Sequence, residues 1–142
     1  MSGQIKFTVY GEPVAQGRAK AAIVAGRATV YDPKPSRDYK RDIKAVAQNH
    51  VPDKLLTGPL VLELKVFRPI PKSFSKAKRV LALSGDLLPT TKPDLKNYVA
   101  GVEDALEKMI YDNDSQIVSY GDTGKYYGDP PRIEVSVKEV GG

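Results

Sequence analysis

The sequence predicts an α+β fold built as one domain, with a mixed or antiparallel sheet flanked by helices. A length of 142 residues is typical of a single domain around one core. Segments that alternate apolar and polar residues stand at both ends of the chain, and segments with helical spacing lie between them. No internal repeat, low-complexity tract or linker divides residues 1–142, so we expect one unit.

The first half of the chain predicts a strand, a hairpin and a helix. Residues 5–9 alternate in the manner of a half-buried strand. Residues 11–35 have Gly and Pro at both ends and two short apolar runs, which indicates a β-hairpin or a mobile arm. Ser36 is expected to cap a helix that runs to about Asn49. His50 then falls at the end of this helix, where a surface position is expected.

The second half predicts two more helices and three strands. Residues 60–66 form a strand with leucines on one face, and residues 75–84 form a short basic helix stopped by Gly85. From Asp94 to about Met109 the apolar residues fall in one stripe at helical spacing. The last two alternating segments are QIVSY (116–120) and RIEVSVKEV (132–140), joined through GDTGKYYGDPP.

Composition excludes several classes of site. The chain has no cysteine, which excludes disulfides, thiolate zinc sites and a cysteine nucleophile. It has no apolar run of signal-peptide or membrane-spanning length, so we expect a cytoplasmic, intracellular protein without a membrane partner. Only His50 is available for histidine-based metal sites or catalytic triads.

Charge is distributed unevenly along the chain. Residues 1–91 carry 16 Lys and Arg against 7 acids, whereas residues 92–122 carry 3 against 7. A basic body attracts phosphates, and an acidic segment concentrates carboxylates where a cation is needed. A solvated basic surface beside an ordinary acidic helix explains the same numbers, so charge alone leaves nucleic-acid binding open.

Acidic residues frame the helix that begins at Asp94. Asp94 precedes it, and Asp112 and Asp114 follow it, so a strand that packs beside the helix start would bring Asp114 towards Asp94. Carboxylate ligands of this kind suit magnesium or manganese, which activate water and neutralise charge on a phosphodiester. By spacing alone, a helix cap followed by a turn is the simpler interpretation.

The run KPDLKNYVAGVEDALEKMIYDNDSQIVSY (92–120) resembles the core signature of the RusA-type Holliday junction resolvases. GEPVAQGR (11–18), GRATVYDPKPSRDYKRDI (26–43) and GDPPRIEVSV (128–137) are similar in order to other parts of that family. The resemblance implies a homodimeric, magnesium-dependent endonuclease that cuts four-way DNA junctions by paired nicks. It implies no organic cofactor.

The same resemblance assigns roles to individual residues. Asp94 matches the family's first essential acid and Asp114 matches the later one, and Asn97 is also in place. The second essential acid falls on Lys96, and the family's helix lysine falls on Ala100. We therefore expect Asp94, Lys96 and Asp114 to be catalytic, with Asp94 and Asp114 binding the metal.

Positions 96 and 100 lie one helical turn apart, so Lys96 is placed to contact the phosphate that the family's lysine contacts. It cannot replace a carboxylate ligand, and its charge competes with the metal. Asp112 is the expected substitute if residues 112–114 are extended. Glu103 and Asp104 lie roughly 13 to 15 Å along the helix from Asp94, too far to share its ion.

DNA contacts are expected from Lys and Arg, which attract phosphates without sequence preference. They are Arg18, Lys20 and Arg27 on the arm, Lys92 beside the acids, and Lys125. Tyr126 and Tyr127 either stack on bases at an open junction or pack in the sheet, and sheet packing is the simpler interpretation.

Two other functions are compatible with the sequence. One is a junction-binding protein that has lost or weakened cleavage because of Lys96. The other is a structural nucleic-acid-binding domain without junction preference.

Overall fold

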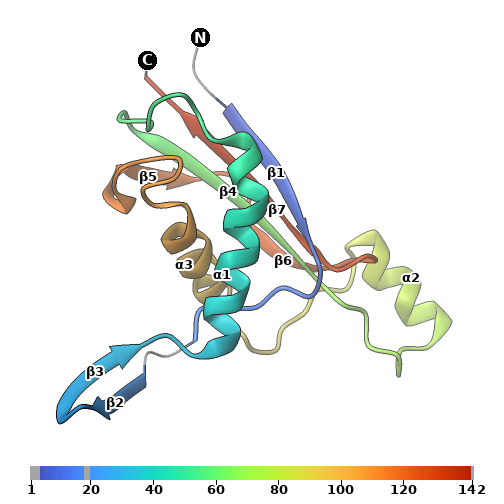
Figure 1. Ribbon diagram of the computed structural model, residues 1–142. Helices are drawn as coiled ribbons and strands as arrows, with labels where there is room; N and C mark the ends of the chain where they lie inside the picture. The colour runs from blue at the N-terminus through green and yellow to red at the C-terminus, as the bar shows by residue number, and fades with distance from the viewer. Residues whose placement is uncertain (1–3, 18–19, 142) are drawn as a thin grey trace.

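Five strands form one mixed sheet in the computed structural model, which describes residues 4–17 and 20–141. The strands are β1 (Gln4–Tyr10), β4 (Leu60–Arg68), β5 (Ile117–Tyr120), β6 (Gly124–Tyr127) and β7 (Arg132–Glu139). Their order is β1-β7-β4-β5 (Figure 1). β5 pairs with the first part of β4, and β6 pairs with the last part of the same strand. β7 is antiparallel to both β1 and β4, whereas β5 and β6 are parallel to β4. The predicted α+β fold with a mixed sheet is confirmed.

One face of the sheet forms the core. The alternating apolar residues of β4 are Leu60, Leu62, Leu64 and Val66, and all four side chains are fully buried. They pack against α1 (Lys34–Ala47) and α3 (Leu95–Leu106), which lie together on this face in Figure 1. Burial of each such side chain contributes about 1.5–3 kcal/mol. Because α3 packs on this core, the residues at its two ends are held at fixed places beside the sheet.

The boundaries of α1 differ from the prediction. The helix begins at Lys34, with Pro33 as its N-cap and Pro35 in the first turn, where a missing N–H costs nothing. Ser36 is therefore not the cap but a buried helical residue, and its hydroxyl accepts the Gly17 N–H at 2.7 Å. The helix ends at Ala47, and a 3-10 turn (Gln48–His50) follows. His50 is exposed, as expected, and its ring stacks on Phe7.

The helix α3 ends at Leu106, earlier than the predicted Met109. Glu107 leaves the helical conformation with ψ 133°, and Lys108 adopts a positive φ of 70°. The chain then turns back so that Ile110 and Tyr111 become fully buried. Tertiary burial of these two side chains therefore overrides the helical pattern of the sequence.

The segment GKYY was predicted as part of a connection but forms β6. It pairs with β4 over four residues, from Lys65 opposite Gly124 to Arg68 opposite Tyr127. Tyr126 stacks on Phe67 with ring centroids 5.4 Å apart, and Tyr127 meets Phe74 edge-on at 5.6 Å. Both tyrosines therefore pack within the sheet region.

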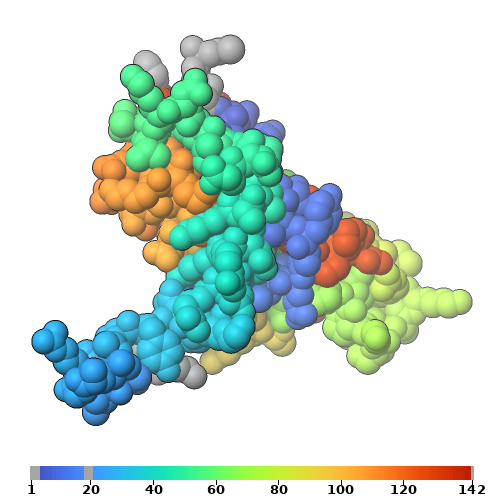
Figure 2. Space-filling model, viewed as in Figure 1, coloured from blue at the N-terminus to red at the C-terminus, as the bar shows by residue number. Residues whose placement is uncertain are grey.

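Two elements project from this body. The strands β2 (Lys20–Val24) and β3 (Arg27–Tyr31) form an antiparallel hairpin, called the arm below, which extends away from the sheet (Figures 1 and 2). The short helix α2 (Lys76–Ser84) is capped by Ser75 and, as predicted, stopped by Gly85, which has a φ of 86°. In the part of the chain that is described, no helix is long and apolar enough to cross a membrane.

Candidate nucleic-acid interface and active site

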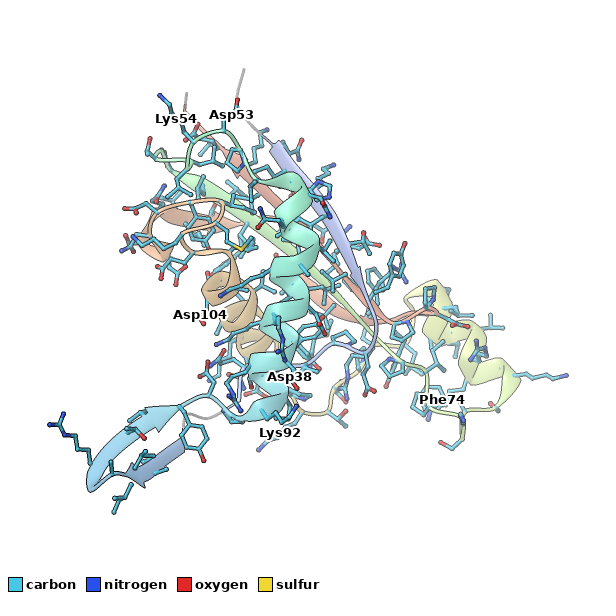
Figure 3. The ribbon with its side chains drawn as sticks, viewed as in Figure 1. Asp38, Asp53, Lys54, Phe74, Lys92 and Asp104 are labelled. Carbon is cyan, nitrogen blue, oxygen red and sulfur yellow. The ribbon has the colours of Figure 1, made fainter. Side chains whose placement is uncertain are left out.

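A cleft of about 590 Å³ opens at the start of α3. It is lined by Gln16, Gly17, Lys92, Pro93, Asp94, Lys96 and Asn97. Two of these residues are exposed lysines, Lys92 and Lys96, which flank the exposed Asp94 in the sequence. In the view of Figure 3, Lys92 lies towards the end of α1 that joins the arm. The cleft thus combines cations that attract phosphate with one accessible carboxylate.

Asp94 occupies the N-cap position of α3, but its side chain makes no capping hydrogen bond. The backbone conformation there is extended, with φ −69° and ψ 148°. A carboxylate at a helix N-terminus is favoured by the helix dipole. Its carboxylate therefore lines the cleft together with the two lysines and is not used to close the helix.

Long basic side chains brace the loop that leads into α3. Lys125 on β6 donates from Nζ to the carbonyl oxygens of Thr91 and Pro93, each at 3.0 Å. Arg68 at the end of β4 donates to the Thr91 carbonyl at 3.1 Å. Gln16 donates its backbone N–H to the Asn97 carbonyl at 2.9 Å. The position of Asp94 is thus fixed from the sheet.

A second cleft, of about 440 Å³, follows α3 away from its N-terminus. Its lining is Leu95, Lys96, Val99, Glu103, Tyr120, Gly121 and Thr123, so Lys96 borders both clefts. The Tyr120 hydroxyl donates to Glu103 Oε2 at 2.5 Å. Burial raises the pKa of Glu103, and the hydrogen bond from Tyr120 opposes that rise. In turn, the hydrogen bond to Glu103 raises the pKa of Tyr120 to about 12.

Asp114 lies at the opposite end of α3 from Asp94. Its backbone N–H donates to Oε2 of Glu107, the residue that follows the helix, at 3.0 Å. The side-chain oxygen Oδ1 is buried and has no hydrogen-bond partner. Burial raises the pKa of Asp114; the neighbouring Tyr111 hydroxyl opposes this rise, and the charges of Glu107 and Asp104 add to it. A buried carboxylate oxygen without a hydrogen-bond partner is suited to binding a cation.

The three expected metal ligands are not gathered into one site within the chain. The twelve residues of α3 span about 18 Å and separate Asp94 from Asp114. Asn113 is extended, but a 3-10 turn with Asn113 as its cap begins at Asp114, so residues 112–114 do not continue as a strand. Asp112 instead pairs with Lys108 at 2.6 Å. Among the described residues, no group of three metal-ligating side chains is close enough to hold an ion.

Asp94 by itself still fits a magnesium ion in one respect. Magnesium keeps several waters and often binds through one or two carboxylates together with substrate phosphates. Asp94 has free oxygens in a cleft whose lysines attract phosphate. A complete set of protein ligands shared by Asp94, Asp112 and Asp114 does not fit the geometry of one chain.

The predicted DNA-binding cations fall in two regions. Lys92 and Lys125 lie at the loop that begins α3, and Arg27 is exposed at the turn of the arm. Lys20 begins β2, but its side chain lies outside the described part of the structure, as does the whole of Arg18. The cleft and the arm are therefore separate basic regions.

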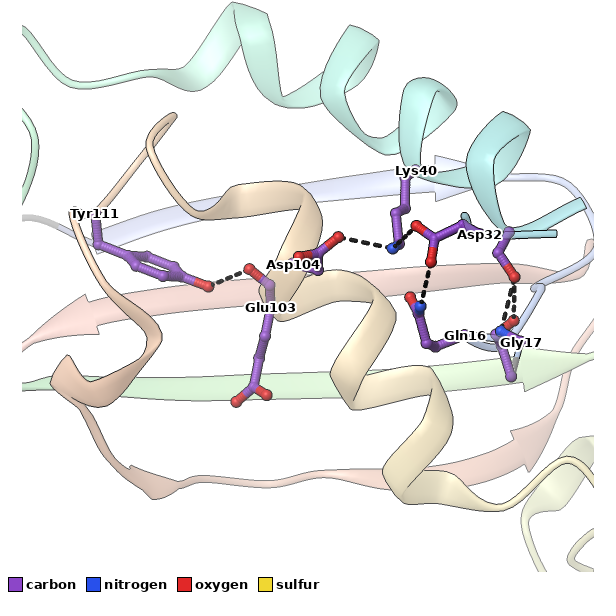
Figure 4. A network of polar contacts seen from close by, with 9 residues as sticks. Gln16, Gly17, Asp32, Lys40, Glu103, Asp104 and Tyr111 are labelled. Atoms are coloured by element: carbon purple, nitrogen blue, oxygen red, sulfur yellow. Dashed lines mark hydrogen bonds and ion pairs between the residues drawn. The ribbon is translucent and has the colours of Figure 1, made fainter. Parts of the chain in front are cut away.

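A buried ion cluster joins the base of the arm to both core helices (Figure 4). The Lys40 side chain is 10% exposed, and its Nζ lies 2.7 Å from Asp32 of the arm base and 2.7 Å from Asp104 of α3. Gln16 donates to the second oxygen of Asp32 at 3.1 Å. The hydrogen bond from Lys40 lowers the pKa of Asp32. The cluster fixes the direction in which the arm leaves the body.

Sequence reasoning set Glu103 aside as a metal ligand and missed Lys40 as a part of the site. Glu103 lies seven residues after Lys96, which is about two helical turns, so spacing alone places both on one face of α3. No comparable signal exists for Lys40, because its partners come from segments distant in sequence. Only the packing of α1 against α3 brings these charges together.

Comparisons with known proteins agree with the fold. The profile of a family described as endodeoxyribonuclease RusA matches residues 10–138. A protein of Bacillus subtilis (strain 168), described as uncharacterized protein YqaN, is 49% identical over 138 residues. That alignment covers 96% of each chain.

Proposed function

Because this chain belongs to the RusA endodeoxyribonuclease family, we propose that it cuts four-way (Holliday) DNA junctions in recombination and repair. The observation that carries the proposal is the cleft at α3, where the family's signature segment places Asp94 between Lys92 and Lys96. The lysines would bind the phosphates of the junction strands, and the arm would contact DNA further away. Junction resolution needs two cuts related by near two-fold symmetry, so the acting species is a homodimer.

Asp94 and Lys96 carry the proposed chemistry at the cleft, and Asp114 is the proposed second catalytic acid and metal ligand, although it lies at the far end of α3, with Asp112 as a further candidate ligand. Asp94 would hold magnesium, or manganese in its place, together with phosphate oxygens of the DNA. The ion supplies activation of water and neutralisation of charge on the phosphodiester. Lys96 would contact the scissile phosphate from the border between the two clefts. Lys125 would keep the Asp94 loop in place.

One alternative function has a specific observation in its favour. A lysine stands where the family has its second acid, and α3 separates Asp94 from Asp114. Both features favour a protein that binds junctions and cuts them weakly or not at all. Such a protein would bind a junction without added metal.

The decisive experiment is cleavage of a synthetic mobile four-way junction with magnesium or manganese. The natural chain is compared with Asp94→Asn, Asp114→Asn and Lys96→Asp, and we expect the two asparagine variants to lose cutting. If the natural chain cuts nothing while Lys96→Asp cuts, the binding function replaces the nuclease. If cutting survives the loss of both Asp94 and Asp114, the proposed site is wrong.

Two controls sharpen this test. Asp112→Asn breaks only an exposed ion pair with Lys108 in the structure, and a loss of cutting as deep as that of Asp94→Asn would make Asp112 a ligand. Competition between the junction and a linear duplex of equal length measures structural preference. Equal affinity for both would leave a nucleic-acid-binding domain without junction preference.

A further inference from the structure

The segment from the end of β4 through α2 carries cations and no acid. Residues 64–85 contain six Lys and Arg and no Asp or Glu. The six cations are Lys65, Arg68, Lys72, Lys76, Lys78 and Arg79. They are separate from the cations of the arm and from the two lysines of the cleft. Like charges this close in sequence repel one another, so such a run indicates an anionic partner.

Two of the six cations are neutralised within the fold, and four are not. Lys65 Nζ lies 3.2 Å from Asp122, and the Arg79 guanidinium lies 2.6 Å from Asp129. Among the residues that the structure describes, the other four form no ion pair. We call these four the basic ridge: Arg68, Lys72, Lys76 and Lys78.

The lysines of the basic ridge are exposed, but the segment that carries them is anchored. Phe74 lies between them in sequence, and its ring meets that of Tyr127 on β6 edge-on, with centroids 5.6 Å apart. Lys78 Nζ lies 4.3 Å from the centre of the Phe74 ring. Lys72 and Lys76 are exposed on either side of this aromatic contact in the sequence. Because the segment is already held on the sheet, binding to it orders less of the chain.

A groove connects the basic ridge to the cleft at the start of α3. Its volume is about 400 Å³, and it shares four lining residues with the cleft, Gln16, Gly17, Pro93 and Asn97. Its lining also includes Arg68 and one acid, Glu12. Arg68 Nη1 donates to the carbonyl and the hydroxyl of Thr91 at 3.1 and 3.2 Å. The ridge therefore begins at the loop that leads into Asp94.

The cleft lies between two basic elements. In the view of Figure 3, Lys92 lies between the arm and Phe74 along one edge of the molecule. The arm and α2 project from opposite sides of the body (Figures 1 and 2). The duplex branches of a four-way junction diverge from the crossover, and phosphate contacts fix how a protein is oriented on such DNA. Cations on both sides of the cleft suit a branched substrate.

We propose that the basic ridge binds the phosphate backbone of one duplex branch of the junction, on the side of the cleft opposite to the arm. The proposal rests on the proposed function and adds a DNA-binding surface outside its cleft. Lysine and arginine attract phosphates without sequence preference. The ridge therefore contributes affinity and orientation, and it does not select a base sequence.

A membrane surface fits the same segment less well. Helices that lie on anionic membranes separate a cationic face from an apolar face. In α2, Lys76 and Val80 are four residues apart, so they are neighbours on the helix surface. Val80 is 64% exposed. Cationic and aliphatic side chains are therefore mixed on the exposed side of α2, which phosphates of DNA tolerate and a lipid interface does not.

Junction affinity is measured in EDTA, so that cutting does not consume the DNA. A variant with both Lys72→Gln and Lys76→Gln is compared with the natural chain on a junction with long branches, across salt concentrations. Each lost phosphate contact reduces the salt slope by about 1, so we expect a slope smaller by about 2 and binding at least about fivefold weaker near 100 mM salt. Circular dichroism confirms that the variant is folded.

Lys54→Gln is the matched control for this measurement. Lys54 is exposed, and Figure 3 shows it at the other end of the sheet from Phe74. This variant should bind the junction like the natural chain. Equal affinity and equal slope for the double variant and the natural chain would refute the ridge and leave the proposed function standing. If the natural chain binds no junction, with or without magnesium, the proposed function fails together with the ridge.

The absence of native cysteine allows the DNA beside the ridge to be mapped. A Ser73→Cys chain labelled with an iron–EDTA reagent cuts the DNA backbone close to the label. We expect cuts within a duplex branch, away from the crossover, and no localised cuts from the same label on Lys54→Cys. Cuts confined to the crossover, or the same pattern from both labels, would overturn the proposal. So would a double variant that keeps its junction affinity but loses binding to phosphatidylglycerol vesicles, because the ridge would then bind membranes.

Discussion

Replacing Lys40 by methionine tests whether the buried ion cluster holds the arm on the body. Lys40 is the only cation between Asp32 and Asp104 among the contacts that the structure describes, and its own side chain is 10% exposed. Methionine keeps the length and much of the apolar stem but removes the charge. Two carboxylates are then left facing each other across the gap between α1 and α3.

Breaking a buried pair by removing one partner costs about 3–5 kcal/mol. The cost is smaller here, because the side chains of Asp32 and Asp104 are 31% and 58% exposed and water can hydrate them. We therefore expect the free energy of unfolding to fall by about 1–3 kcal/mol. For a chain of this size, that corresponds to a lower melting temperature by about 3–9 °C.

Urea unfolding followed by circular dichroism measures this loss. Lys34→Met is the control, because the exposed pair of Lys34 and Asp38 is worth only about 0.3–0.5 kcal/mol. The hydrogen bond from Lys40 lowers the pKa of Asp32 in the folded protein. The stability that ionised Asp32 contributes is therefore present above its ordinary pKa of 3.8 and is lost as pH falls through the lower pKa of the folded state. The difference in free energy of unfolding between the natural chain and Lys40→Met should decrease below about pH 4. Equal stability of Lys40→Met and Lys34→Met at pH 7 would refute the reasoning.

Three further outcomes are expected. Burial raises the pKa of Glu103, so its carboxyl contributes stability below the ordinary pKa of 4.5, and this contribution is lost as pH rises. Glu103→Gln should therefore gain stability relative to the natural chain between pH 4 and pH 7. The absence of any gain in urea unfolding would contradict this. Gly85→Ala should cost about 1 kcal/mol of unfolding free energy, because the φ of 86° strains an alanine while nothing lies near the added carbon. Lys125→Met should speed amide exchange in residues 90–92 and weaken junction binding, with little change in global stability; unchanged exchange there would show that the loop does not depend on Lys125.

Local patterns predicted most of the elements correctly. The alternation of leucines identified β4, and Gly85 identified the end of α2, because both depend on neighbours along the chain. The predictions were wrong where contacts between segments distant in sequence determine the structure. GKYY became β6 by pairing with β4, and α3 ended early because Tyr111 is buried in the core. Ser36 is buried beside Gly17 instead of capping α1.

For the candidate site, the sequence by itself determined which residue types are present. It placed Asp94 at the start of a helix, lysine at position 96 and an acidic segment after a basic body. Only the tertiary structure decided which of these residues meet. It placed Asp114 at the far end of α3, paired Asp112 with Lys108 and joined Lys40 to two distant acids. The physical reason is that helix length and sheet pairing fix distances in space, and sequence separation does not.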